Sequence, residues 1–137
     1  MLSSATDEIQ LIFSRASSLK RYERLGMFNI LRKKAENGIV TRILIGTDNP
    51  INKKEVEWLS EYPRIELRYL IKSIKTRLTT IVTDRELSLV IEEKENDENL
   101  DDLGLATYSN SESTVLSCSS IFENLWSQST SHYRRMN

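Results

Sequence analysis

The sequence predicts a single α/β domain in which a mixed sheet is flanked by helices. Short apolar runs typical of buried strands alternate with amphipathic segments typical of helices. Two strand-like segments, residues 77–83 and 87–91, are separated by only three residues, which indicates an antiparallel hairpin. The length of 137 residues suits one domain with one hydrophobic core.

The first part of the chain is predicted to contain two strands with a helix between them. Residues 8–14 have the apolar density of a central strand, and residues 40–45 form the second strand. A polar loop at residues 15–21 leads to a helix at residues 22–37, and Gly38 suits the left-handed position after a helix. One face of this helix carries Leu25, Phe28, Leu31 and Ala35.

The middle of the chain is predicted to add a short helix, a strand and a solvated loop. Asn52 and Glu55 have the spacing of a capping box, which predicts a short helix that ends at Pro63. Residues 65–70 alternate between apolar and polar side chains and are predicted to form a strand. The segment 92–102 carries seven acidic residues and almost no apolar ones, which is typical of a solvated loop.

The stretch 104–126 is predicted to be a short buried strand that breaks at a polar corner and continues as an amphipathic helix from Ser111. Residues 128–137 form a polar tail that is expected to continue the helix, to fray, or to link to a following module. Trp58 and Trp126 lie on apolar helix faces and are expected in the core. The apolar face of the last helix carries Val115, Cys118, Ile121 or Phe122, and Leu125.

Composition and charge narrow the class of protein. The chain is 39% hydrophobic and 28% charged, as soluble globular proteins are. A net charge of −1 argues against a nucleic-acid-binding or membrane-surface protein, because those carry a basic excess. No apolar run approaches the roughly 20 residues that span a bilayer, and the N-terminus has no signal-peptide pattern. The single cysteine cannot form an internal disulfide, so we expect a cytoplasmic protein and a packed thiol at Cys118.

The inventory of reactive side chains excludes most catalytic sites. The single histidine, His132, lies in the polar tail, so a Ser-His-Asp or Cys-His site would need that tail to fold back. One cysteine and one histidine do not supply a zinc site. The four glycines are scattered, so no glycine-rich phosphate loop exists. We therefore expect no cofactor and no metal.

Polar residues at the predicted strand ends are the candidates for ligand binding. Open α/β sheets bind ligands at the carboxyl ends of their parallel strands. Arg15 follows the first strand, and Ser109, Asn110 and Ser111 follow the last one at a helix N-terminus. The alternative for Ser109 is a capping box with Glu112, which would make it a structural cap.

The hairpin contributes two further candidates, Arg77 and Thr79. Arg77 and Thr79 point to the same face of their strand because side chains alternate along a strand. Arg77 offers a bidentate donor for a carboxylate or phosphate. Asp84 is interpreted as the start of the hairpin turn.

The chain resembles an input domain of archaeal sensor histidine kinases, a domain that is similar to one half of a phospholipase D-like enzyme. The resemblance covers residues 6–128 and is most specific at Gly104–Ser111 and Ile121–Trp126; Arg24–Gly26 and Val82–Arg85 support it. It implies a phospholipase D-like single domain.

Phospholipase D-like enzymes use an HxKxxxxD motif, in which the histidine is the nucleophile and the lysine holds the phosphate. Alignment of the aspartate on Asp84 puts Thr79 at the lysine position and Arg77 at the histidine position. Arginine stays protonated and cannot be the nucleophile, and threonine has no charge for the phosphate. The resemblance therefore implies a degenerate, non-catalytic domain.

From these observations we expect a ligand-sensing or dimerisation domain of a signal-transduction histidine kinase. The expected partners are a small anionic ligand, a second copy in a homodimer, and a following PAS or kinase module, with no nucleic acid and no membrane. The alternatives are the effector-binding domain of an archaeal transcription regulator and a phospholipase D-like phosphodiesterase.

Overall fold

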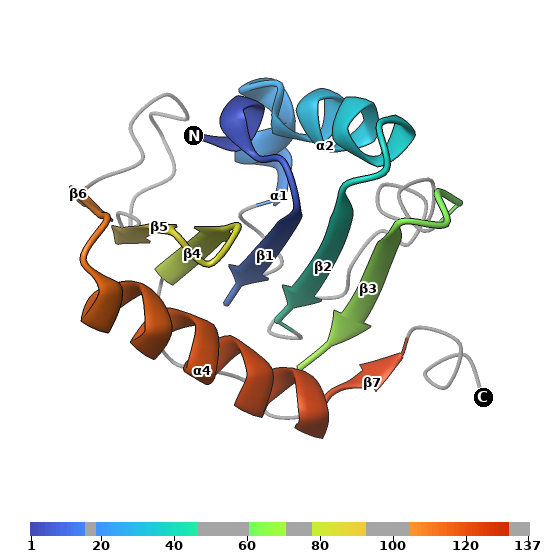
Figure 1. Ribbon diagram of the computed structural model, residues 1–137. Helices are drawn as coiled ribbons and strands as arrows, with labels where there is room; N and C mark the ends of the chain where they lie inside the picture. Colours follow the sequence, from blue (N-terminus) through green and yellow to red (C-terminus); the bar gives the residue numbers. More distant parts are fainter. Residues whose placement is uncertain (16–18, 47–60, 71–77, 93–104, 132–137) are drawn as a thin grey trace.

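The computed structural model describes residues 1–15, 19–46, 61–70, 78–92 and 105–131, and contains a seven-stranded sheet with helices on both faces (Figure 1). The elements follow the chain as the 3-10 turn η1 (Leu2–Ser4), β1 (Glu8–Phe13), α1 (Leu19–Arg24), α2 (Met27–Glu36), β2 (Val40–Ile45), β3 (Ile65–Tyr69), β4 (Leu78–Thr83), β5 (Leu87–Glu92), β6 (Leu105–Ser109), α4 (Glu112–Gln128) and β7 (Thr130–Ser131).

The strands lie in the order β6-β5-β4-β1-β2-β3-β7, and the predicted mixed sheet is confirmed. β1, β2 and β3 are parallel, and every other neighbouring pair is antiparallel. Phe13, Ile45 and Tyr69 therefore end at one edge, which we call the carboxyl edge, and β4 begins there at Leu78. The hairpin turn after Thr83 lies at the opposite edge, beside the start of β1.

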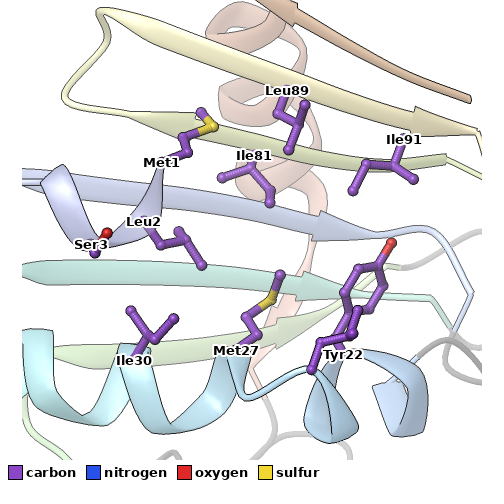
Figure 2. A pocket seen from close by; sticks show the side chains of 10 residues that line it. Met1, Leu2, Ser3, Tyr22, Met27, Ile30, Ile81, Leu89 and Ile91 are labelled. Carbon is purple, nitrogen blue, oxygen red and sulfur yellow. The ribbon is translucent and has the colours of Figure 1, made fainter. Parts of the chain in front are cut away.

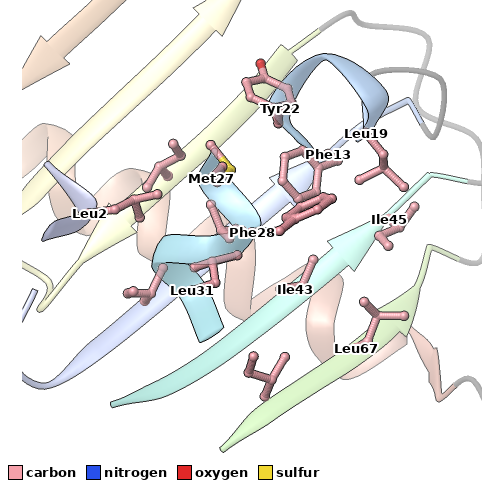
Figure 3. Packing of buried hydrophobic residues seen from close by; sticks show 14 of the residues in the cluster. Leu2, Phe13, Leu19, Tyr22, Met27, Phe28, Leu31, Ile43, Ile45 and Leu67 are labelled. Carbon is pink, nitrogen blue, oxygen red and sulfur yellow. The ribbon is translucent and has the colours of Figure 1, made fainter. Parts of the chain in front are cut away.

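The larger core lies between the sheet and the layer of η1, α1 and α2 (Figure 3). The Phe13 ring centroid lies 5.3 Å from that of Tyr22 and 6.4 Å from that of Phe28, in an edge-to-face arrangement with the latter. Such aromatic contacts add to the free energy that burial of the rings supplies. The strands contribute alternate side chains to this face, among them Leu11, Phe13, Ile43, Ile45 and Leu67.

The helical segment after β1 departs from the prediction. A helix begins already at Leu19, in the expected loop, and the expected single helix is divided into α1 and α2 at Gly26. Gly26 has φ of 84°, a left-handed conformation that an L-residue rarely adopts, so the chain turns there. Leu25 is consequently 50% exposed and not on the buried face, whereas Gly38, at φ of 86°, confirms the predicted left-handed end.

Helix α4 covers the other face of the sheet and forms a smaller core there. Its buried positions are Val115, Ser119, Phe122 and Trp126, a spacing of four, three and four residues that keeps one face of a helix on the sheet. The predicted burial of Trp126 is confirmed, and Phe122 rather than Ile121 is buried. Cys118 is half-buried, beside the buried face of α4 rather than at one of its buried positions.

The two ends of the closing stretch also differ from the prediction. β6 is an exposed edge strand rather than a buried one: among the described strands it pairs with β5 alone, and Leu105 is 65% exposed. α4 ends at Gln128, and the chain then pairs with β3 as β7 instead of continuing as a helix. Ser129 has extended backbone angles, which ends the helix.

Several predicted features lie outside the described residues: the capped helix after Asn52, Trp58, Arg77, most of the acidic segment, and His132. The β4–β5 hairpin is confirmed, with six paired positions. Its turn places Asp84 and Arg85 at φ of 55° and 54°, and the Glu86 N–H donates to the Thr83 carbonyl at 3.0 Å. Positive φ at both central residues matches the right-handed twist of the flanking strands.

Candidate functional site

At the carboxyl edge, the backbones of β1, β2 and β4 come together around Ser14. The buried Ser14 hydroxyl donates to the Leu78 carbonyl and accepts the Leu78 N–H at 2.9 Å, which joins the end of β1 to the start of β4. The Gly46 N–H donates to the Phe13 carbonyl at 2.8 Å. A Cβ at Gly46 would lie 2.0 Å from the Ser14 carbonyl oxygen, so only glycine allows this approach.

Two of the predicted ligand-binding residues lie at this edge. Arg15 follows Ser14 directly and is half-buried. Thr79 is fully buried and lies in register with Phe13 on one side and Ile91 on the other, on the face that α1 and α2 cover. Arg77 precedes β4 in sequence but lies outside the described residues. The Thr79 side chain is thus part of the core rather than of an open cleft.

The other three predicted residues lie at the opposite edge. Ser109 pairs with Ser88, which pairs with Val82 near the hairpin turn, so Ser109, Asn110 and Ser111 are not beside Arg15. β6 runs antiparallel to β5, and this direction carries its end away from the carboxyl edge. The expected convergence of Arg15 with this corner was therefore wrong.

The corner also caps α4 in a way the sequence did not predict. Ser111, not Ser109, is the N-cap residue, and its side chain makes no capping hydrogen bond. The Ser109 hydroxyl instead accepts the Ser111 N–H at 3.0 Å. Glu112 is the first helical residue, where its carboxylate suits the positive end of the helix dipole. The predicted capping box between Ser109 and Glu112 was wrong.

Asp84 holds the opposite edge together. Its carboxylate accepts the N–H groups of Thr6 at 3.0 Å, Asp7 at 2.7 Å and Glu8 at 2.9 Å, as well as the Thr6 hydroxyl at 3.3 Å. Burial alone would raise the pKa of Asp84, but these hydrogen bonds to the charged form outweigh it and lower the pKa below its usual value. Asp84 opens the turn, as predicted, and also fixes the start of β1 to the hairpin.

A polar and aromatic cluster under α4 was not among the predicted sites. Glu123 accepts hydrogen bonds from Gln10 at 3.1 Å and from Arg42. The Arg42 guanidinium lies 5.0 Å from the Phe122 ring centroid, and that of Arg68 lies 4.3 Å from the Trp126 ring centroid. Both distances allow a cation–π attraction.

A sequence signal for this cluster exists. A polar residue interrupts each of the apolar strands β1, β2 and β3 at a position that faces the same side of the sheet: Gln10, Arg42 and Arg68. Gln10 is 1% exposed, and its Oε1 has no hydrogen-bond partner within the part of the chain that the structure describes.

Among the described residues, no group of three or more histidine, cysteine, aspartate or glutamate side chains could hold a metal ion. Within the same ranges, no helix has the length and apolarity needed to cross a membrane.

Solved structures with the same fold include three of different kinds. NucT from Helicobacter pylori superposes with a TM-score of 0.71 at 14% identity, over 95% of this chain and 85% of NucT. TrmBL2, an archaeal chromatin protein whose structure shows a novel mode of DNA binding, gives 0.68 at 17% identity, over 95% and 47%. The phosphatidylserine synthase of Haemophilus influenzae Rd KW20 gives 0.57 at 13% identity, over 98% and 36%.

These likenesses establish the fold. No protein-family model and no curated protein matches the sequence. The chain has a phospholipase D-like α/β fold, as NucT and the phosphatidylserine synthase do. It spans less than half of TrmBL2 and of the synthase. At identities below 20%, the shared fold carries no activity from one protein to another.

Proposed function

We propose that this chain is a non-catalytic, ligand-sensing domain with a phospholipase D-like fold, which serves a cytoplasmic signal-transduction histidine kinase as a homodimer. The observation that supports this proposal most is the surroundings of Thr79 and Asp84, two residues at positions aligned with the catalytic motif. Thr79 is fully buried in the core, and the Asp84 carboxylate is occupied by backbone N–H groups at the other edge. Both observations support a non-catalytic role.

The carboxyl edge is the proposed site for a small anionic ligand. Arg15 lies there at the end of β1, and Arg77 immediately precedes β4, which starts at the same edge. Two guanidinium groups would bind a carboxylate or phosphate with paired hydrogen bonds. A ligand that bridges the ends of β1 and β4 would favour one spacing of these strands over another, which is what a sensor requires.

α4 is the proposed reporter of ligand binding. It contacts each parallel strand through a polar group: Gln10 of β1 and Arg42 of β2 donate to Glu123, and Arg68 of β3 donates to the Trp126 carbonyl at 3.2 Å. A change in the spacing of the three strands would strain these contacts. The helix would then shift on the sheet together with β7, through which the chain continues.

Thermal unfolding with inorganic phosphate and with citrate tests the proposed site. A ligand at 100 times its Kd stabilises the native state by about 2.7 kcal/mol. We expect a saturable rise in Tm that Arg15→Ala and Arg77→Ala abolish, and that Arg85→Ala at the opposite edge leaves intact. If no anion raises Tm, or if Arg15→Ala and Arg77→Ala keep the full shift, the proposed site is wrong.

A phosphodiesterase is the competing enzymatic function, favoured by the fold shared with NucT and the phosphatidylserine synthase. Hydrolysis of bis(p-nitrophenyl) phosphate tests it. We expect no turnover above buffer. Turnover that His132→Ala abolishes would overturn the non-catalytic proposal, because His132 is the single histidine of the sequence.

The effector-binding domain of an archaeal transcription regulator is the competing binding function, favoured by the likeness to TrmBL2 over 47% of that chain. The coding sequence around this chain separates the two. A DNA-binding segment upstream would support the regulator, and a kinase core downstream would support the sensor.

A further inference from the structure

An apolar cavity of about 280 Å³, open to solvent, lies on the face of the sheet that α1 and α2 cover (Figure 2). Its walls come from η1, from α1 and α2, and from β4 and β5, which are far apart in the sequence. Figure 2 shows side chains of all these elements directed toward one another across the hollow. The walls include Leu2, Tyr22, Met27, Ile81, Leu89 and Ile91.

The turn at Gly26 explains why the core is not closed here. α1 is only six residues long, and the left-handed Gly26 redirects the chain before α2 begins. The helical layer therefore leaves Leu89 only partly covered on β5. The apolar side chains that line this open pocket lack protein neighbours on its inner side and so forfeit the contacts that full burial would give them.

The lining selects the chemistry of an occupant. The side chains around the cavity carry no charge, and their polar side-chain groups are the hydroxyls of Ser3 and Tyr22, which lie at opposite ends in Figure 2. An ion would lose its hydration among side chains that offer it no opposite charge. An uncharged apolar molecule would instead regain the contacts that the empty hollow lacks.

The volume selects the size of the occupant. An engineered apolar cavity of about 150 Å³ accepts benzene. A cavity of about 280 Å³ therefore has room for a molecule of roughly ten non-hydrogen atoms. This is much less than a helix or strand of a partner protein occupies.

We propose that this cavity binds a small uncharged apolar molecule, of the size of a bicyclic aromatic ring or a medium-length aliphatic chain. The cavity shares no lining residue with the proposed anion site of Arg15 and Arg77 and does not depend on the sensing of an anion there. A ligand can bind at either site while the other site is empty.

Titration of the full chain with indole and with 1-octanol, followed by amide NMR shifts, tests the proposal. An affinity tag belongs at the C-terminus, because Met1 is among the lining residues. We expect saturable shifts centred on Ile81, Leu89 and Ile91. Leu89→Trp fills the hollow and should weaken both probes at least tenfold.

The matched control is Leu116→Trp, the same substitution at an exposed position on α4, on the other side of the sheet. It should leave both affinities unchanged. If Leu89→Trp does not fold, Ile30→Trp closes the cavity from α2, where Ile30 is only partly buried. Shifts that do not saturate, or that persist unchanged in the filled variant, would overturn the proposal.

Two further outcomes would also contradict it. Octanoate that binds at least tenfold more tightly than 1-octanol would show that the site selects an anion. A dimer that Leu89→Trp converts to a monomer, in a protein that binds neither probe, would show that a second copy covers the hollow.

Discussion

The two faces of the sheet are packed by different means. The face under α1 and α2 is held by the larger apolar core, which includes the edge-to-face pair of Phe13 and Phe28. Within the described residues, the face under α4 has a smaller apolar cluster, bordered by two arginines and a glutamate. Burial of apolar area stabilises without regard to direction, whereas ion pairs and cation–π contacts depend on geometry. The first face therefore supplies most of the stability, and the second determines where α4 lies.

The largest expected effect is the loss of an aromatic ring from either face. Phe13→Ala should reduce the free energy of unfolding by about 3–5 kcal/mol, because the ring is fully buried between Tyr22 and Phe28. Phe122→Ala should lie at the low end of that range, because α4 can settle into the space. Urea unfolding measures both, with Leu116→Ala as the exposed control. A larger loss for Phe122→Ala would reverse the comparison.

The next largest loss of stability is expected from a substitution of Asp84, which binds the start of β1 to the hairpin turn. Because the folded pKa of Asp84 is lowered, its charged form stabilises the protein above the unfolded value of about 3.9, and this contribution disappears as the pH falls through the folded pKa. Asp84→Asn should cost about 1.5–3 kcal/mol at pH 7 and progressively less below pH 4. Unfolding at several pH values measures this, with the exposed Glu86→Gln as control. A cost that does not change with pH would contradict it.

The ion pair under α4 should contribute less. A double-mutant cycle of Arg42→Ala and Glu123→Ala is expected to give a coupling energy of roughly 1–2 kcal/mol, because the Arg42 side chain is only 19% exposed. The more exposed pair of Glu66 and Arg68 should give less than about 1 kcal/mol and lose it in salt. Equal coupling energies for the two pairs would contradict the claim that the Arg42–Glu123 contact helps to position α4.

The smallest expected effects come from one buried hydroxyl on each face. Thr41, on the α2 side, and Ser88, on the α4 side, have hydroxyl oxygens without a hydrogen-bond partner in the described ranges. Thr41→Val and Ser88→Ala should each be neutral or stabilise the protein by up to about 1 kcal/mol, because no hydrogen bond is lost. Thermal unfolding measures both. A loss above about 1 kcal/mol for either one would reveal a partner of that hydroxyl.

Local pattern predicted the elements of the fold well. The apolar runs at Glu8–Phe13 and Val40–Ile45 and the hairpin from Leu78 to Glu92 are strands as expected. The helix break at Gly26 was missed, because an amphipathic stripe continues in the sequence on both sides of it. Periodicity describes a face but does not show where the backbone leaves a helix.

The candidate site was predicted less well. Its residues come together only if the strands that carry them end at the same edge of the sheet, and the sequence does not specify strand direction. Arg15 and Thr79 do lie at the carboxyl edge, but the direction of β6 carries Ser109, Asn110 and Ser111 to the other edge. The polar cluster under α4 joins Gln10, Arg42 and Glu123, of which Gln10 and Glu123 are 113 positions apart. Contacts at that separation have no local signal.

The sequence by itself determined the mixed α/β class and the type of most elements, because short-range alternation carries this information. The tertiary structure alone decided which strand ends meet, which face of α4 is buried, that Asp84 serves the backbone of β1, and that a hollow remains beside Gly26. These properties depend on strand order and direction. Strand order follows from the total burial of the folded chain, to which residues far apart in sequence contribute together.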